Sequence, residues 1–240
     1  ETFDFDMVVQ TFSQSLSPGN EQRNFWGSDA ADTNGSRNII GIRTLHGPHG
    51  NALFGFSTWN GATVHQDFIN RYSDDDKRKA QWLLGSQPGG VNYTLNISSL
   101  TSAGIEEGAR SAKFLPVPPY SGESASNDFP VFRYADVLLT KAEAILRNGG
   151  DEAAARALVD EVRNRAGLDN YNGAMTLNEV YNERGRELCW EGHRRQDMIR
   201  YGTFTAARSF KGASSDIYKL FPIPSDAIAN NDRLVQNPGY

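Results

Sequence analysis

Aromatic side chains in the first part of the chain are interspersed with polar residues that can hydrogen-bond a sugar. Phe25-Trp26, Trp59-Asn60 and Arg71-Tyr72 lie among Gly, Asn, Asp and Ser, outside any strong hydrophobic periodicity. An aromatic face can stack on the apolar C–H face of a sugar ring, while neighbouring amides and charges bind its hydroxyls. The candidate contacts are Trp26, Trp59, Tyr72, Arg23, Asn24 and Asn60. The competing interpretation, in which each ring anchors its loop to the core, stays open.

Three carboxylates, Glu183, Glu187 and Glu191, are spaced four residues apart and therefore share one face of a predicted helix. Carboxylates placed together can act as general acid and base in glycoside hydrolysis. Each of the three also has an Arg three or four residues away, as in the predicted pairs Glu183–Arg186 and Glu191–Arg195. Ion pairing favours the charged form, so we expect depressed pKa values and predict no catalytic residue.

The histidines, the acidic run and the cysteine form no recognisable metal or nucleophile motif. His46 and His49 flank a Gly-Pro dipeptide, which favours a surface turn over a chelating helix. Asp74–Asp76 resembles the start of a calcium loop but lacks the remaining ligands of an EF-hand, so a helix N-terminus explains it better. Cys189 lies in a helical pattern and is predicted to be a packed thiol. We predict no metal and no cofactor.

Composition places the chain among folded globular proteins. It has 240 residues, 38% of them hydrophobic, and a formal net charge of −5, which excludes whole-chain disorder and suggests one large domain or two small ones. An acidic balance without a dense Lys/Arg stripe argues against a nucleic-acid partner. A single cysteine excludes an intramolecular disulfide, and no apolar run approaches the ~20 residues that span a bilayer.

Residues 1–127 read as a loop-rich part and residues 128–240 as a helical part. In the helical part, apolar residues recur at three- and four-residue spacing from Phe132 to Leu146, and the pattern stops at Asn148-Gly149-Gly150. Asp151 is a good N-cap for a second helix that ends at Ala166-Gly167. So short a connection predicts an antiparallel pair, similar to one tetratricopeptide repeat.

A further helix is predicted from the capping box Thr176 to Glu179 through Leu188, Trp190 and Met198 to Gly202. In the loop-rich part, the acidic run predicts a helix over residues 77–84, with strands over 91–97 and 113–117. Trp82 and Trp190 lie within the helical patterns and are predicted to be core residues.

Three segments resemble the SusD/RagB family when taken together. They are FPVFRYADVLLTKAEAILRNGG (129–150), NERGRELCWEGHRRQDMIRYGTF (182–204) and LFPIPSDAIANNDRLVQNPGY (220–240). The family resembles this chain in Arg-x-Ala-Asp-Val-Leu-Leu, in Glu-Leu-x-x-Glu-Gly-x-Arg-x-x-Asp, and in Phe-Pro-Ile-Pro before a terminal Asn-Pro-Gly-Tyr. One departure is Gly185, where the family usually has Arg and where Gly costs ~1 kcal/mol of helix propensity.

The resemblance implies a mainly α fold, in which tetratricopeptide-like helical pairs carry long irregular loops and a minor β-hairpin. On this basis residues 1–240 are expected to be the C-terminal region, with the family's N-terminal repeats and lipid-anchoring Cys absent. Glu187, Glu191, Arg194 and Asp197 are expected to tie neighbouring helices and the C-terminal loop by partly buried ion pairs, and they belong to a set of structural motif residues. The full set is Arg133, Asp136, Glu143, Glu187, Glu191, Arg194, Asp197, Pro222 and Pro224.

The same resemblance implies a non-catalytic protein on the surface of the bacterial outer membrane, mainly in Bacteroidetes. Its expected partners are a glycan, a SusC-like TonB-dependent transporter, and the membrane itself through a lipid anchor. Two other hypotheses remain open. One is a protein- or peptide-binding helical scaffold of the same uptake system, and the other is an α-helical glycosidase with two unpaired carboxylates in a cleft.

Overall fold

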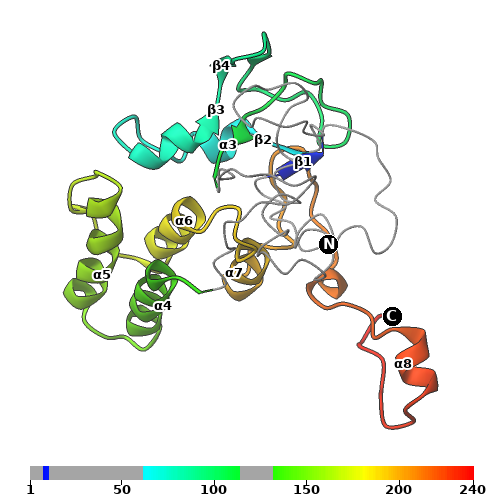
Figure 1. The fold of residues 1–240 in the computed structure, drawn as a ribbon. Coiled ribbons are helices and arrows are strands. Elements are labelled where there is room, and N and C mark those ends of the chain that lie inside the picture. The colour runs from blue at the N-terminus through cyan, green and yellow to red at the C-terminus, as the bar shows by residue number, and fades with distance from the viewer. Residues whose placement is uncertain (1–7, 11–61, 114–131) are drawn as a thin grey trace, which may run out of the picture. The chain divides into compact units, whose positions relative to one another are not determined.

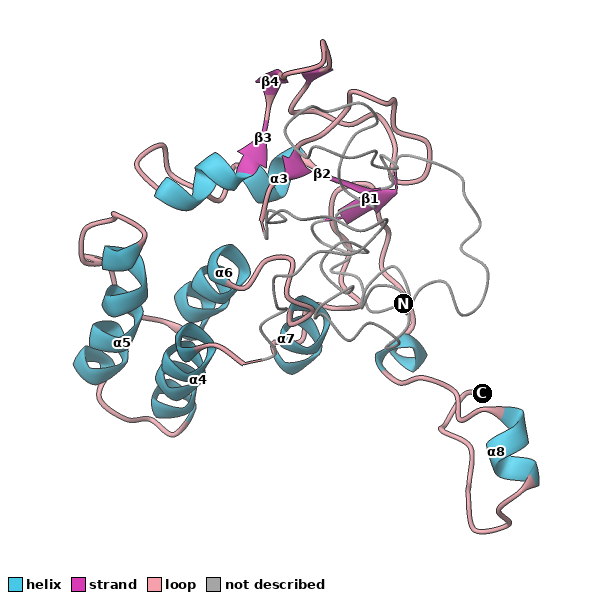
Figure 2. Ribbon diagram, viewed as in Figure 1, coloured by secondary structure: helices cyan, strands magenta, loops and turns pink. Residues whose placement is uncertain are grey.

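The computed structural model describes residues 8–10, 62–113 and 132–240 (Figure 1). The chain divides into two compact units, Glu1–Arg194 and Arg195–Tyr240. Helices dominate and strands are short (Figure 2), which confirms the mainly α fold class. The predicted boundary at residues 127 and 128 lies outside the described residues. Among the helices that the structure describes, none combines the length and apolar character needed to cross a membrane.

The predicted helical pair is present in the first unit as α4 (Tyr134–Arg147) and α5 (Glu152–Arg165). Asp151 caps α5 by accepting a hydrogen bond from the Ala153 amide at 2.8 Å, and Gly149 supplies the left-handed backbone, φ 65°, that ends α4. Leu139 and Ala142 of α4 pack with residues of α5 in one buried cluster. Phe132, predicted to start this apolar face, is 86% exposed, because α4 begins only at Tyr134.

The long helix predicted from Thr176 to Gly202 is wrong, because two helices occupy that stretch: α6 (Leu177–Glu187) and α7 (Arg194–Arg200). The start is as predicted, since the Thr176 hydroxyl accepts from the Glu179 amide at 3.3 Å. Between the helices, Trp190 has φ 66° and Gly192 has φ 80°. A left-handed residue cannot continue a right-handed helix, so α6 ends before Trp190.

Short strands and turns make up residues 62–113. β1 (Val8–Gln10) pairs antiparallel with β2 (Ala62–Val64), which leads into α3 (Gln66–Ile69). Asp76 caps a 3₁₀ helix, Lys77–Gln81, as the acidic run predicted. This helix stops before residue 84, because the chain then extends into β3.

Two further antiparallel pairs follow: β3 (Trp82–Leu83) with β6 (Arg110–Ser111), and the small hairpin β4 (Gly85–Ser86) with β5 (Asn92–Tyr93). The strand predicted over 91–97 is therefore shorter than expected. Lys113 belongs to no strand, and residues 114–117 lie outside the described part.

A second buried cluster links this part to the end of α6. Its members include Phe68, Trp82, Cys189 and Trp190. The rings meet edge to face, with centroids 5.6 Å apart for Phe68–Trp82 and 6.3 Å for Trp82–Trp190. Trp82 and Trp190 are core residues and Cys189 is a fully buried thiol, as predicted. The two tryptophans, however, lie on a strand and in a bend and not on helices.

The second unit carries a 3₁₀ helix, Asp216–Lys219, and α8 (Ser225–Ala229). Between them, residues 220–224 include Pro222 and Pro224, and Pro224 directly precedes α8. The side-chain amide of Gln236 binds the backbone of Ile223 on both sides, at 2.8 and 2.9 Å. The Gln236 side chain thus provides hydrogen-bond partners for the backbone of Ile223, which lies between two prolines and forms no helical hydrogen bonds.

Candidate functional site

The six predicted sugar contacts fall into two groups. Arg23, Asn24, Trp26, Trp59 and Asn60 lie outside the described residues and stay a prediction. Tyr72 lies in the core, 3% exposed. Its hydroxyl donates to the Arg186 carbonyl oxygen at 2.9 Å, and its ring meets Phe68 edge to face.

Burial and the neighbouring Cys189 raise the pKa of Tyr72 well above its ordinary value. The prediction that Tyr72 stacks on a sugar is therefore wrong, because packing hides its ring. For this residue the competing interpretation, a ring that anchors its loop, is the one that the structure supports.

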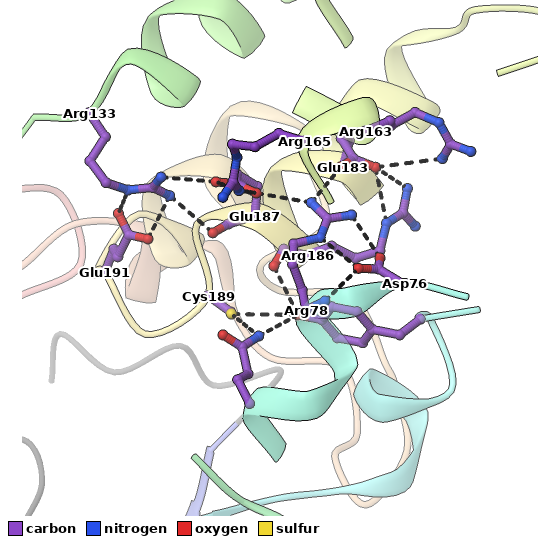
Figure 3. Close-up of polar contacts among 12 residues, drawn as sticks. Asp76, Arg78, Arg133, Arg163, Arg165, Glu183, Arg186, Glu187, Cys189 and Glu191 are labelled. Carbon is purple, nitrogen blue, oxygen red and sulfur yellow. Dashed lines mark hydrogen bonds and ion pairs between the residues drawn. The ribbon is translucent and has the colours of Figure 1, made fainter. Parts of the chain in front are cut away.

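The motif carboxylates form the most extensive polar cluster in the described part of the first unit (Figure 3). Glu183 accepts from Arg78 at 2.7 Å and from Arg186 at 2.6 Å. Glu187 accepts from Arg133 at 2.9 Å, from Arg165 at 2.6 Å and from Arg78 at 3.0 Å. Their side chains are no more than 2% exposed. Glu187 thereby joins three separate segments, because its cations come from the 3₁₀ helix at Lys77–Gln81, from the start of α4 and from the end of α5.

Glu191 completes the cluster beyond the end of α6. Arg133 binds it through Nε and Nη2, both at 2.7 Å, and the Lys113 ammonium also donates to it. Lys113 and Arg133 stand on either side of residues 114–131 and meet on this one carboxylate (Arg133 and Glu191 in Figure 3). Glu191 therefore holds Lys113 and Arg133 at the same place.

Side chains from other segments also bind the last carbonyl groups of α6 and a carbonyl just beyond its end. The Tyr72 hydroxyl donates to the Arg186 carbonyl, and Lys113 Nζ donates to the carbonyls of Glu187 at 3.0 Å and Cys189 at 2.7 Å. Arg133 adds a bond to the Glu187 carbonyl at 3.1 Å. A helix C-terminus has unpaired carbonyls and a partial negative charge, so two cations and a hydroxyl are favourable there.

The electrostatics of the cluster oppose proton transfer. Burial would raise the pKa of Glu187, but the hydrogen bond from Arg133 and the charges of Arg165 and Arg78 hold it below its ordinary value. Burial likewise opposes charge on Asp76, and bonds from Arg78 lower its pKa. A carboxylate that stays charged is a poor general acid near neutral pH. The predicted ion pairing is thus present, and the cluster is suited to holding elements together.

The remaining motif residues also make structural contacts. Asp136 pairs with Arg184 at 2.8 Å, and Glu143 pairs with Arg147 at 2.7 Å. In the second unit, Asp197 pairs with Arg200 at 2.6 Å. The predicted Glu191–Arg195 pair is wrong, because the bend at Trp190 interrupts the helical register that it required.

Gly185 has a physical explanation in the position of Arg194. The Arg194 guanidinium lies 3.7 Å from the centre of the Tyr181 ring, and its Nη1 donates to the Tyr181 carbonyl at 3.0 Å. A Cβ at Gly185 would lie 3.1 Å from that same Nη1. The missing side chain at Gly185 therefore leaves room for the Arg194 guanidinium against α6.

Sequence reasoning missed the cations that come from a distance, namely Arg78, Lys113, Arg163 and Arg165. One feature of the sequence could have indicated these cations. Three carboxylates at four-residue spacing lie on one helical face and repel one another, so they need cations from other segments. In the part of the chain that the structure describes, no group of three His, Cys, Asp or Glu side chains could hold a metal ion. His46 and His49 lie outside that part.

Comparison with known proteins identifies similar sequences and folds. The profile of the SusD family matches residues 84–240. The starch-binding protein SusD of Bacteroides thetaiotaomicron is 38% identical over 122 residues, which are 47% of this chain and 22% of that protein. A probable peptide-binding protein, YejA of Agrobacterium fabrum, is 52% identical over only 42 residues, 18% of this chain and 7% of that protein.

Among solved structures, the surface glycan-binding protein A of Bacteroides thetaiotaomicron in complex with laminarihexaose is similar, with a TM-score of 0.62 and 25% identity. The likeness covers 82% of this chain and 46% of that one. The chain therefore spans about a fifth of its SusD relative and about half of this structural neighbour.

Proposed function

Because this chain belongs to the SusD family, we propose that it is part of a surface glycan-binding protein that captures an oligosaccharide or polysaccharide without catalysis. The observation that carries the proposal is the likeness, over most of the chain, to a protein whose structure holds laminarihexaose. The starch-binding relative supports the same class of ligand. The ionic cluster is consistent with a non-catalytic binding role. Its carboxylates are bound to arginines in ion pairs, so they are not free to act as the general acid and base of a hydrolase.

In this proposal the cluster has a structural role and holds elements of the first unit together. Arg78 connects the 3₁₀ helix at Lys77–Gln81 to α6, and Glu191 fixes Lys113 and Arg133 together. Trp26 and Trp59 are the proposed stacking rings. Arg23, Asn24 and Asn60 are the proposed hydroxyl partners.

The proposal extends to the cellular setting. The full-length protein is held on the outer face of the bacterial outer membrane by a lipid anchor, and it passes its glycan to a SusC-like TonB-dependent transporter. Co-purification of the tagged full-length protein with such a transporter from outer-membrane fractions tests this part. Recovery of the tagged protein in the cytoplasmic fraction, with no transporter bound, would contradict it.

Native affinity electrophoresis tests ligand binding directly. The chain is run through gels that contain starch, laminarin or other polysaccharides, and we expect retardation on at least one of them. Trp26→Ala and Trp59→Ala should reduce the retardation, whereas Trp26→Phe, which keeps a ring, should preserve most of it. No retardation on any glycan, or equal retardation of the wild type and both alanine variants, would refute the proposal.

A second candidate function is peptide binding by a helical scaffold. The short match to a relative named as a probable peptide-binding protein favours it, although it covers only 18% of this chain. Isothermal titration of the chain with a mixed tryptic peptide pool separates the two functions. Heat from peptides together with no retardation on glycans would support the scaffold, and the reverse result would exclude it.

A further inference from the structure

Aromatic rings of the second unit face solvent at Phe210, Tyr218, Phe221 and Tyr240, where the sequence predicted no ligand contact, and the last three lie near residues 217–221. Tyr218 is 57% exposed, Phe221 is 52% exposed and Tyr240 is 45% exposed. Large apolar side chains gathered on a surface, in contrast to scattered single ones, mark an interaction site. The question is therefore whether these rings are held together, and what they could bind.

Side chains hold the backbone beneath the rings in place. Arg195 Nη2 donates to the carbonyl oxygen of Tyr218 at 3.0 Å, and the Tyr240 hydroxyl donates to that of Leu220 at 3.0 Å. Asn237 Nδ2 donates to the carbonyl oxygen of Phe221 at 2.7 Å. These bonds fix the carbonyl groups of residues 218, 220 and 221, and the Tyr240 hydroxyl is bound to the same short segment that carries Tyr218 and Phe221.

Arg195 also fixes the orientation of one ring. Its guanidinium carbon lies 4.2 Å from the centre of Phe221 and 5.0 Å from the centre of the buried Phe204. The cation therefore joins a core ring to a surface ring. The Arg195 guanidinium covers part of the Phe221 ring, and the rest of the ring is exposed to solvent. The contact also restricts the rotation of the Phe221 side chain.

The size of the surface favours a sugar over a protein. A stable protein interface buries about 800 Å² on each partner, which three rings on one short segment do not supply. An oligosaccharide needs only a few rigid rings, because each ring stacks on the C–H face of one sugar unit. The side-chain amide of Asn237 and the hydroxyl of Tyr240 bind backbone carbonyls in this segment. Stacking of a ring on a sugar does not require either group.

We propose that Tyr218, Phe221 and Tyr240 form a second glycan-contacting surface, which binds hexose oligosaccharides by stacking. The inference rests on the proposed function, since it assumes that the ligand is a glycan. It adds a surface on the second unit that is separate in sequence from Trp26 and Trp59. Two contact surfaces on one protein raise its avidity for a polysaccharide that presents many copies of the same unit.

The test uses the full 240-residue chain in affinity electrophoresis, on a glycan that retards the wild type. Tyr218→Ala and Phe221→Ala should each weaken binding by about two- to tenfold, the value of one stacked ring. Tyr218→Phe keeps the ring and should bind like the wild type. Leu220→Ala is the matched control, because Leu220 is exposed to a similar extent but has no ring.

Thermal unfolding of each variant shows whether it is folded, and Tyr218→Ala, which removes only an exposed side chain, should unfold like the wild type. Unchanged binding by a Tyr218→Ala/Phe221→Ala double variant would overturn the inference and leave the proposed function intact. Equal weakening by Leu220→Ala and Tyr218→Ala would also overturn it, since stacking would not be the cause. If no glycan retards the wild type, the proposed function and this inference both fail.

Discussion

Replacement of Glu187 by Gln should strongly destabilise the protein. The Glu187 carboxylate is 2% exposed and accepts bonds from Arg78, Arg133 and Arg165. Loss of one partner from a buried ion pair typically costs ~3–5 kcal/mol, because the remaining charge is left buried. Here Arg165 is 60% exposed, and Arg78 and Arg133 keep Glu183 and Glu191, respectively. The low end of the range applies, about 3 kcal/mol.

Urea unfolding followed by far-UV circular dichroism measures this change. We expect the urea concentration at the unfolding midpoint to be lower and the m-value to be unchanged, since the surface exposed on unfolding stays the same. Asp74→Asn is the control, because Asp74 is 98% exposed and pairs only at the surface with Lys79; it should leave the midpoint where it is. A Glu187→Gln variant as stable as the Asp74→Asn control would refute the reasoning that the cluster holds the elements together.

Four further predictions follow from the same contacts. The free energy of unfolding should fall as pH drops below about 4.5, because the pKa of Glu187 is lower in the folded state than its ordinary 4.5. The stabilisation from the charged Glu187 is fully present above the pKa of the unfolded state and is lost as the carboxylate of the folded protein becomes protonated. Glu187→Gln should flatten that part of a stability–pH curve measured by urea unfolding. Gly185→Ala should not gain the ~1 kcal/mol of helix propensity, because the new Cβ would meet the fixed Arg194 guanidinium at 3.1 Å; a thermal midpoint above that of the wild type would contradict this. Trp190→Gly should be about 1 kcal/mol more stable than Trp190→Ala in urea unfolding, since only Gly adopts φ 66° without strain, and the reverse order would be inconsistent with the bend. Cys189 should react with a thiol reagent only after denaturation, because it is fully buried; fast reaction in the native state would show that the core opens there.

Local signals in the sequence were sufficient for the helical pair. The Asp151 cap and the glycine after α4 act on neighbouring residues, and the structure contains both. The Thr176 cap at the start of α6 is local in the same way. The bend after α6 was not predictable in this way. A Trp with φ 66° contradicts its own local preference and is held only by tertiary packing.

Long-range contacts explain the other differences. The helical face of Glu183, Glu187 and Glu191 was visible in the sequence, but its cations Arg78 and Lys113 come from distant segments that no spacing rule connects. Tyr72 lies in a polar stretch between Asn70 and the acidic run Asp74–Asp76, and only the folded chain brings it against Cys189. The exposure of Tyr218 and Phe221 was likewise not predictable from the sequence, because it depends on how the folded unit packs.

The most direct test of the central claim is the retention of the chain in native gels with and without polysaccharide. The account predicts slower migration in at least one gel that contains laminarin or starch, with the retardation reduced in Trp26→Ala and Trp59→Ala. Equal migration of the wild type in all gels, with and without glycan, would contradict it.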